Sequence, residues 1–297
     1  MPTARQSVLP DANNFRTVAR ALTVVENDLP GADELLKGLN LDNKVPVIGI
    51  TGPPGAGKST LVNALIAELC TDGKKVAVLA IDPTSPFNYG SLLGDRIRMA
   101  SHFNHPDVFI RSLATRGSLG GLSAKTIEMS DALRASGFDY VLIETVGVGQ
   151  SEMEIAGLAD ITLLVLVPES GDEIQNIKSG IMEIADAFII NKADRDGADA
   201  YYNALKKLIH QKENPIPIYK AVASQNIGIT EIAGYIKQAS LITNNRREYL
   251  LTEKAWQLIR QQRIADVDKK KLQQEIAEAM QVPGFNLYKW IAYETDR

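Results

Sequence analysis

The fold of this chain is decided by the stretch Gly52-Pro53-Pro54-Gly55-Ala56-Gly57-Lys58-Ser59-Thr60. An apolar run at 45–51 precedes it and a helical pattern at 61–69 follows it, so it connects a strand to a helix. In that setting glycines let the backbone curl until successive N–H groups face phosphate oxygens, and the helix dipole adds attraction. We expect Lys58 to reach the β- and γ-phosphates and the Ser59 hydroxyl to bind Mg²⁺. The stretch therefore predicts that the protein binds a nucleoside triphosphate, and we expect each of the residues 52–60 to contact it.

Composition narrows the class of protein. The 297 residues are enough for one large α/β domain with appendages or for two domains. The formal net charge of −4 argues against a dedicated nucleic-acid binder, which carries a basic excess. Cys70 is the only cysteine, which excludes an internal disulfide and fits a reducing compartment. No apolar run is long enough to cross a bilayer, and the first residues lack the apolar core of a signal peptide. We therefore expect a cytoplasmic protein with no membrane and no nucleic-acid partner.

Short apolar runs alternate with helical segments from residue 45 onward. Because strands that are covered on both faces are apolar throughout, this pattern predicts a mostly parallel, doubly wound α/β sheet of the P-loop NTPase class. Ligands of such sheets lie at the carboxyl ends of the strands. The expected strands are Val45–Thr51, Lys75–Ile81, Val108–Arg111, Tyr140–Glu144, Ile161–Val167, Ala187–Asn191 and Ile216–Val222.

Helical patterns flank this alternating region. Apolar residues recur at helical spacing over 15–25, and a short helix is expected at 33–37, which we interpret as a helical cover on the main domain. After Ile242 the strand pattern stops, and amphipathic helices are expected at 246–263 and 269–281. The predicted organisation is an N-terminal helical extension at 1–43, a P-loop domain at 44–242 and a C-terminal helical arm at 243–297.

The four residues Asn191-Lys192-Ala193-Asp194 follow another apolar strand. A carboxylate at Asp194 can accept hydrogen bonds from the guanine N1–H and the exocyclic amine, whereas adenine offers no such pair of donors. A site built on hydrogen bonds rejects analogues that lack them, because its own polar groups are then left unpaired. The Lys192 stem can lie over the base, and Asn191 can tie this loop to the phosphate loop. These residues therefore predict that the nucleotide is GTP.

Acidic residues end two further strands. Glu144 is placed to hold Mg²⁺ through water or to orient the attacking water, because Mg²⁺ needs few protein ligands. The N–H of Gly147, in the loop that follows, could contact the γ-phosphate. Asp82 is a second candidate for Mg²⁺ and Asp95 a further one, although an acid at a helix N-terminus is an equal interpretation of Asp95. Gln150 could position the attacking water, as in other GTPases, or contact a partner. The catalytic candidates are Lys58, Glu144 and Gln150.

Other stretches of the chain extend these motifs: Arg20–Glu26, Gly49–Thr60, Ile81–Ser85, Leu93–Met99, Thr115–Ser123, Glu144–Glu152 and Asn191–Asp194. Together they resemble the methylmalonyl-CoA mutase-associated GTPases, the MeaB and ArgK type related to the human methylmalonic aciduria type A protein. The match runs over roughly residues 14–230. Thr115–Ser123 and Glu144–Glu152 are close to diagnostic of this family.

The resemblance implies a GTPase that uses the change from GTP to GDP as a switch. Such a GTPase is a chaperone that gates cofactor loading and protects or reactivates an adenosylcobalamin-dependent acyl-CoA mutase, such as methylmalonyl-CoA mutase. The resemblance also implies a homodimer that forms through the C-terminal helices. Glu169–Lys178 matches the family's extra switch segment, which relays the nucleotide state to the mutase. By position, the resemblance implies Mg²⁺-site roles for Ser59, Asp82, Asp95 and Glu144, and base contacts for Asn191, Lys192, Asp194 and Ala223.

Two features depart from the family pattern. Where the family has paired glycines, this chain has Asn88-Tyr89-Gly90, and Tyr89 restricts the loop. Beyond Ile242 the match fades, and the aromatic cluster at 285–291 fits either a core or a subunit interface. Two other functions are considered. A metallochaperone GTPase of the same fold would call for a segment rich in His or Cys, and a transport-linked ATPase or small-molecule kinase is disfavoured by Asn191–Asp194.

Overall fold

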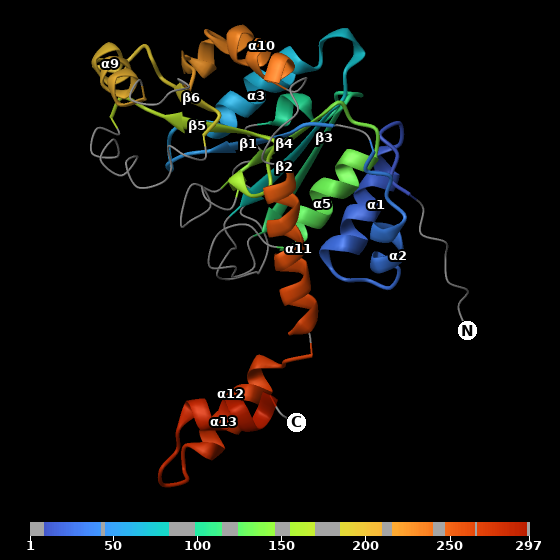
Figure 1. The fold of residues 1–297 in the computed structure, drawn as a ribbon. Helices are drawn as coiled ribbons and strands as arrows, with labels where there is room; N and C mark the ends of the chain where they lie inside the picture. Colours follow the sequence, from blue (N-terminus) through green and yellow to red (C-terminus); the bar gives the residue numbers. More distant parts are fainter. Residues whose placement is uncertain are drawn as a thin grey trace. The chain divides into compact units, whose positions relative to one another are not determined.

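The computed structural model describes residues 9–42, 45–82, 99–114, 124–145, 155–169, 185–209, 216–239, 247–264 and 266–295. Its centre is a parallel sheet whose seven described strands lie in the order β3-β2-β4-β1-β5-β6-β7 (Figure 1). The predicted doubly wound α/β sheet is confirmed. We call the side of the sheet where the strands end the carboxyl edge. The strands are β1 (Val47–Thr51), β2 (Val76–Asp82), β3 (Val108–Ala114), β4 (Tyr140–Glu144), β5 (Ile161–Leu166), β6 (Ala187–Ile190) and β7 (Ile218–Lys220).

The strand ends differ from the prediction where proline or polar residues intervene. β1 begins at Val47 and not at Val45, and Pro46 between them has no N–H to donate to a ladder. In the same way β7 begins after Pro217, although the Pro217 carbonyl oxygen still accepts from the Phe188 N–H at 2.9 Å. In the other direction, β3 continues three residues past the expected end at Arg111, to Ala114.

Helices cover both faces of the sheet because successive side chains of each strand point to opposite faces. In β2, Val78 and Ala80 join the core beneath α3 (Lys58–Leu69) and α10 (Ile229–Ala239), whereas Leu79 and Ile81 join the core on the opposite face. That second face carries α1 (Phe15–Glu26), α2 (Ala32–Lys37), α5 (Ala124–Ala135) and, over β5 and β6, α9 (Ala198–Ile209). Short 3₁₀ turns lie at η1 (Thr71–Gly73), η2 (Ala100–His102) and η3 (Ala223–Gln225).

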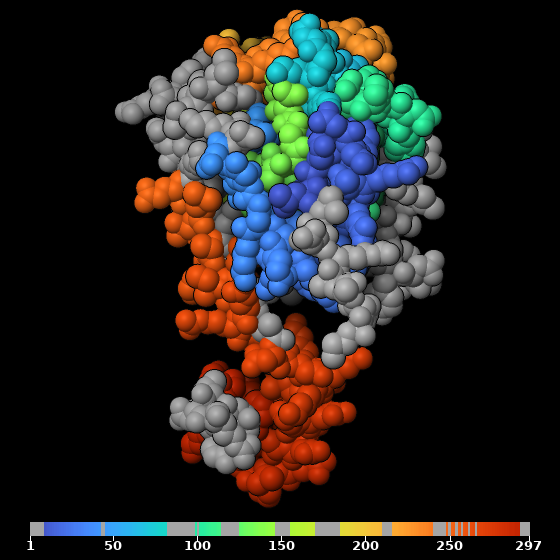
Figure 2. Space-filling model, turned by 90° about the vertical axis from the view of Figure 1, so that its right-hand side faces the viewer, coloured from blue at the N-terminus to red at the C-terminus, as the bar shows by residue number. Residues whose placement is uncertain are grey.

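The two N-terminal helices belong to this core. Val18, Leu22 and Val25 of α1 are fully buried, as their spacing predicted, and Leu35 of α2 is 2% exposed. These side chains share one apolar cluster with Leu79 and other residues of the sheet. Figure 2 shows the helices, in blue, on the surface of this side. The interpretation of 15–37 as a helical cover is confirmed.

The chain divides into two compact units, Met1–Lys254 and Ala255–Arg297. The helix α11 (Arg247–Arg263) runs across the division, and α12 (Lys269–Ala279) and α13 (Leu287–Thr295) belong to the second unit. None of the described residues of α12 is buried. None of the helices in the described part of the chain is both long and apolar enough to span a membrane. The predicted domain boundaries at 43 and 242 stay a prediction.

Candidate guanine-nucleotide site

The phosphate loop begins directly after β1, and its backbone requires glycine at two positions. Gly52 has φ +140°, and a Cβ there would lie 2.0 Å from the carbonyl oxygen of Val165. Gly57, which precedes the first residue of α3, has φ +85°, and a Cβ there would lie 2.5 Å from Nδ2 of Asn191. Any larger residue would therefore push the loop away from β5 or from the loop after β6.

The side chains that follow the loop turn inward. Lys58 is buried, and its Nζ donates to the carbonyl oxygens of Gly52 at 2.8 Å and Pro53 at 3.1 Å. The ammonium group therefore lies inside the turn of the loop, where it would exchange carbonyl acceptors for phosphate oxygens. Ser59 is also buried, and its Oγ donates to Oε1 of Glu144 at 2.6 Å. Helix α3 and strand β4 thus bring a hydroxyl and a carboxylate together at the carboxyl edge.

A second contact joins the ends of β1 and β4. Thr145 Oγ1 donates to Thr51 Oγ1 at 2.9 Å, and both side chains are buried. The Thr145 N–H donates to the Ile50 carbonyl oxygen at 3.0 Å. The first residue beyond Glu144 is therefore fixed to the strand that carries the phosphate loop, which the sequence motifs alone did not indicate.

The loop after β6 contacts the phosphate loop through two side chains. Nδ2 of Asn191 donates to the Ala56 carbonyl oxygen at 2.9 Å, and its Oδ1 accepts from the Ala223 N–H at 3.2 Å. Lys192 Nζ donates to the Gly55 carbonyl oxygen at 2.7 Å. The expectation that Asn191 ties the two loops together is confirmed. Asp194 is exposed, two residues beyond Lys192 on the same loop.

A profile of the family described as methylmalonyl-CoA mutase-associated GTPase MeaB matches residues 18–280. The chain belongs to this family. A Pyrococcus abyssi protein whose name describes it as a GTPase is 50% identical over 231 residues, which are 75% of this chain and 71% of that protein. The mitochondrial methylmalonic aciduria type A homolog of Caenorhabditis elegans is 46% identical over 164 residues, 55% of this chain and 41% of its own. A crystal structure of a LAO/AO transport system kinase covers 96% of this chain and 93% of its own, with 25% identity and a TM-score of 0.65.

This MeaB-family protein is therefore a GTPase with the P-loop fold, and it binds guanine nucleotide. Its sheet brings Lys58, Ser59, Glu144 and Asn191 to one edge. Asp82 ends β2 at the same edge. The predicted site residues Asp95, Gly147 and Gln150 lie outside the described residues, as do Tyr89 and the predicted switch segment beyond Glu169.

An ion pair that the sequence motifs did not indicate lies beside the loop after β6 of this MeaB-family GTPase. Arg195, the residue after Asp194, pairs with Glu169, which stands three residues after β5. The hydrogen bond from Arg195 lowers the pKa of the Glu169 carboxyl group. Both side chains are about half exposed, so the pair contributes little to stability, but it joins the loop after β6 to the first residue of the segment 169–178. The signal in the sequence was the position of Arg195 directly after the four-residue motif.

Proposed function

We propose that this MeaB-family GTPase is a chaperone for an adenosylcobalamin-dependent acyl-CoA mutase, in the first place methylmalonyl-CoA mutase. The observation that carries the proposal is the family profile over 18–280, whose description names association with that mutase. Similarity to the methylmalonic aciduria type A homolog supports the same assignment. In this proposal GTP and GDP set two states of the protein, and the states differ in whether cofactor loading and mutase protection or reactivation proceed.

The residues of the phosphate loop, 52–60, hold the nucleotide phosphates in this proposal. Lys58 supplies the positive charge, since its ammonium group already lies inside the turn of the loop. Asp194 recognises guanine, Lys192 covers the base, and Asn191 with Ala223 holds their loop in place. The hydrogen bond from Asn191 to Ala56 supports this division, because it fixes the distance between the phosphate and base regions.

Mg²⁺ fits the oxygen donors at the carboxyl edge. Ser59 and Glu144 place a hydroxyl and a carboxylate oxygen 2.6 Å apart, and hard oxygen ligands of this kind are what Mg²⁺ prefers. Among the described residues no three His, Cys, Asp or Glu side chains cluster as a metal site, and Mg²⁺ at phosphates needs only one or two carboxylates. When bound, the ion neutralises phosphate charge. The proposed Mg²⁺ residues are Ser59, Asp82, Asp95 and Glu144.

Hydrolysis requires a residue that orients the attacking water. We assign that role to Glu144 or Gln150, and contact with the γ-phosphate to the N–H of Gly147. The bond between Thr145 and Thr51 supports the assignment, since it holds the start of the Gly147 loop against the strand that leads to the phosphate loop. A change in this loop on loss of the γ-phosphate is how GTPases convert hydrolysis into a signal.

The C-terminal arm, 243–297, is proposed to form a homodimer. The second unit of the chain, Ala255–Arg297, exposes large apolar side chains. Trp256 is 62% exposed, Met280 64% and Tyr288 82%. Several exposed large apolar side chains in one small unit are typical of surfaces that another protein covers. Segment 169–178 is proposed to relay the nucleotide state to the mutase, and a cytoplasmic location stays a prediction.

Capture of the partner tests the proposal. The tagged chain is incubated with native extract in the presence of GDP or of a non-hydrolysable GTP analogue, and bound proteins are identified by mass spectrometry. We expect a cobalamin-dependent mutase to be recovered with the two nucleotides in different amounts. The Asp194→Asn variant, with its base recognition weakened, is the control and should lose the difference. Recovery of no cobalamin mutase in either state would overturn the chaperone role.

Similarity to the crystal structure of a protein named as a transport system kinase favours a second candidate, an ATP-dependent kinase. Initial rates of phosphate release from GTP and ATP separate the two functions. We expect the rate with GTP to be much higher than the rate with ATP. The Asp194→Asn variant should hydrolyse GTP more slowly and should accept xanthosine triphosphate, because the C2 oxygen of xanthine needs a hydrogen-bond donor. Equal turnover of ATP, or transfer of its phosphate to a small molecule, would favour the kinase.

A further inference from the structure

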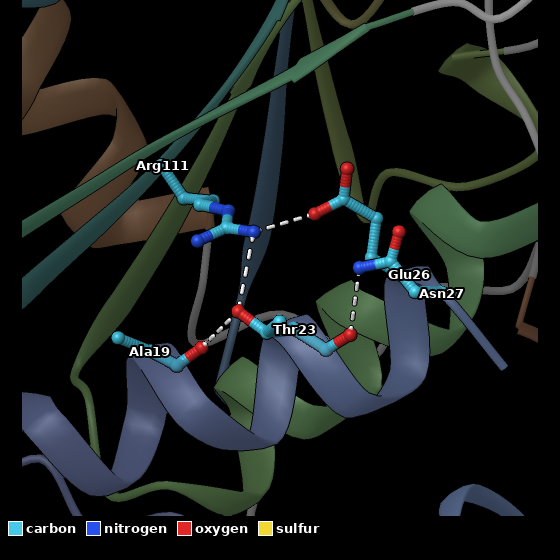
Figure 3. Close-up of polar contacts among 5 residues, drawn as sticks. All are labelled: Ala19, Thr23, Glu26, Asn27 and Arg111. Atoms are coloured by element: carbon cyan, nitrogen blue, oxygen red, sulfur yellow. Dashed lines mark hydrogen bonds and ion pairs between the residues drawn. The ribbon is translucent and has the colours of Figure 1, made fainter. Parts of the chain in front are cut away.

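The C-terminal end of α1 carries two acidic residues that contact two different elements. Glu26 forms an ion pair with Arg111 in β3 (Figure 3). Its Oε2 lies 2.5 Å from Nη2 of Arg111. Asp28, just beyond the helix, has its Oδ1 2.5 Å from Nζ of Lys125 in α5. Arg111 stands three residues before the end of β3, and Lys125 is the second residue of α5. The end of α1 therefore holds both flanks of the β3–α5 connection.

The pair between Glu26 and Arg111 is mostly withdrawn from water. The Glu26 side chain is 10% exposed and that of Arg111 25%. Arg111 Nη2 also donates to Thr23 Oγ1 at 3.4 Å, and this hydroxyl donates to the Ala19 carbonyl oxygen at 2.9 Å (Figure 3). Breaking a buried pair by removing one charge is costly, because the other charge stays buried without compensation.

In the contact between Lys125 and Asp28 only the lysine is withdrawn from water, because the Asp28 side chain is 71% exposed. The Lys125 side chain is 16% exposed, and its Nζ also lies 2.7 Å from Oε2 of Glu128. Burial by itself would lower the pKa of Lys125, but the hydrogen bonds to Asp28 and Glu128 outweigh burial and raise it. The ammonium group is thus held charged between α5 and the end of α1.

The position of β3 matters for the nucleotide because of the sheet order. β3 stands at one end of the described sheet and pairs with β2 alone. Its last residue, Ala114, is in register with Asp82, the last residue of β2. Arg111 shares a strand face with Phe109 and Leu113, whose side chains pack in the cluster that includes α1. These contacts connect the end of α1, through β3, to the last residue of β2 at the carboxyl edge.

We propose that the acidic end of α1 is a positioning element of the GTPase site, acting through Arg111 and Lys125 on the carboxyl ends of β3 and β2. The N-terminal helix then does more than cover the sheet: Glu26 and Arg111 are positioning residues for the backbone at the end of β2, the strand that ends with Asp82. The inference rests on the GTPase activity and on the proposed Mg²⁺ role of Asp82, and does not depend on the mutase.

The test compares Glu26→Gln with Asp139→Asn. Asp139 pairs with Lys74 at 2.8 Å, but these residues precede β4 and β2 and so lie at the opposite edge of the sheet. We expect Glu26→Gln to lower kcat roughly tenfold and to raise the Mg²⁺ concentration for half-maximal rate, since small displacements of catalytic groups have large effects on rate. Asp139→Asn should change neither, even where it lowers the melting temperature by a similar amount.

Two further variants keep the test decisive. Exchange of the two charges in the double variant Glu26→Arg with Arg111→Glu should restore part of kcat, which loss of fold stability alone would not explain. If Glu26→Gln does not fold, Asp28→Asn is measured instead. Because Asp28 is 71% exposed, removal of its charge should destabilise the fold less. An unchanged kcat or an unchanged Mg²⁺ requirement, in a folded variant assayed well below its melting temperature, overturns the proposal.

Discussion

Asn191 donates its side-chain N–H to the carbonyl oxygen of Ala56 at 2.9 Å, which joins the loop after β6 to the phosphate loop. The amide is buried, and its oxygen accepts from the Ala223 N–H on a third loop. One side chain therefore connects three segments that are far apart in the sequence. In the proposed function these are the segments that recognise the base and the phosphates of GTP, so the two recognition elements cannot move independently of each other.

Replacing Asn191 by Ala should weaken GDP binding roughly ten- to a hundredfold, since a buried partner left unsatisfied costs about 1–3 kcal/mol. Titration of a fluorescent GDP analogue measures the affinity. The control is Asn203→Ala, because Asn203 is exposed on α9. Equal affinities of the two variants would show that the tie is dispensable.

Gly52 and Gly55 form a matched pair of positions in one loop. Gly52→Ala should destabilise the protein by about 3 kcal/mol or more and abolish GTP binding, because the new Cβ would lie 2.0 Å from the Val165 carbonyl oxygen. Gly55 has φ +77° with no atom within 4 Å of an added Cβ, so Gly55→Ala should cost only about 1–2 kcal/mol of backbone strain. Thermal unfolding of both variants is the measurement. Similar melting temperatures would contradict the steric argument at Gly52.

Lys58→Ala should reduce GTP affinity roughly a hundredfold, since charge-assisted hydrogen bonds to phosphate are worth about 1.5–3 kcal/mol. Calorimetric titration with GTP gives the affinity, and circular dichroism checks that the fold persists. Lys192→Ala is the comparison, because Lys192 also donates to a carbonyl oxygen of the loop, that of Gly55. We expect Lys192→Ala to lose less GTP affinity than Lys58→Ala. A Lys58→Ala variant that binds GTP normally would remove this residue from the phosphate site.

Cys70 should resist alkylation in the folded protein. Burial, helped by the charges of Asp107 and Asp139, raises the pKa of its thiol to about 11. At pH 8 only about one thiol in a thousand is then the reactive thiolate. Because the folded pKa is raised, the neutral thiol contributes stability below the unfolded pKa, and this contribution is lost as the pH rises through about 11. The alkylation rate of Cys70 is measured by iodoacetamide labelling and mass spectrometry, with denatured protein as the control. Equal rates in the folded and the denatured protein at pH 8 would contradict the raised pKa.

Most strands could be predicted because parallel strands covered on both faces are continuous apolar runs. The end of β3 could not, since Arg111 and Ser112 interrupt its apolar run. β3 is at one end of the described sheet, where polar side chains are tolerated, and an edge position is not visible in the sequence. The seven-residue length of β3 follows from its ladder with β2 and not from its own composition.

At the site, the motifs predicted which segments meet but not all of their contacts. The hydrogen bond from Asn191 to the phosphate loop could be predicted, because the phosphate loop and the motif Asn191–Asp194 both follow parallel strands and so meet at the carboxyl edge. The bond between Thr145 and Thr51, and the pairs of Glu26 with Arg111 and of Glu169 with Arg195, depend on how distant elements pack side by side. Single residues of these types occur throughout any sequence, so only their positions in the fold distinguish them.

The central place of β1 also determines when this chain can begin to fold on the ribosome. Both neighbours of β1, β4 and β5, come later in the chain, and β4 stands between β1 and β2. A nascent chain that ends before Tyr140 therefore has the complete phosphate loop but no strand that could join β1 to β2. Ile48 and Ile50, fully buried in the finished protein, stay without their sheet partners until then. Translation must reach β4, near the middle of the chain, before the first strand has a neighbour in the sheet.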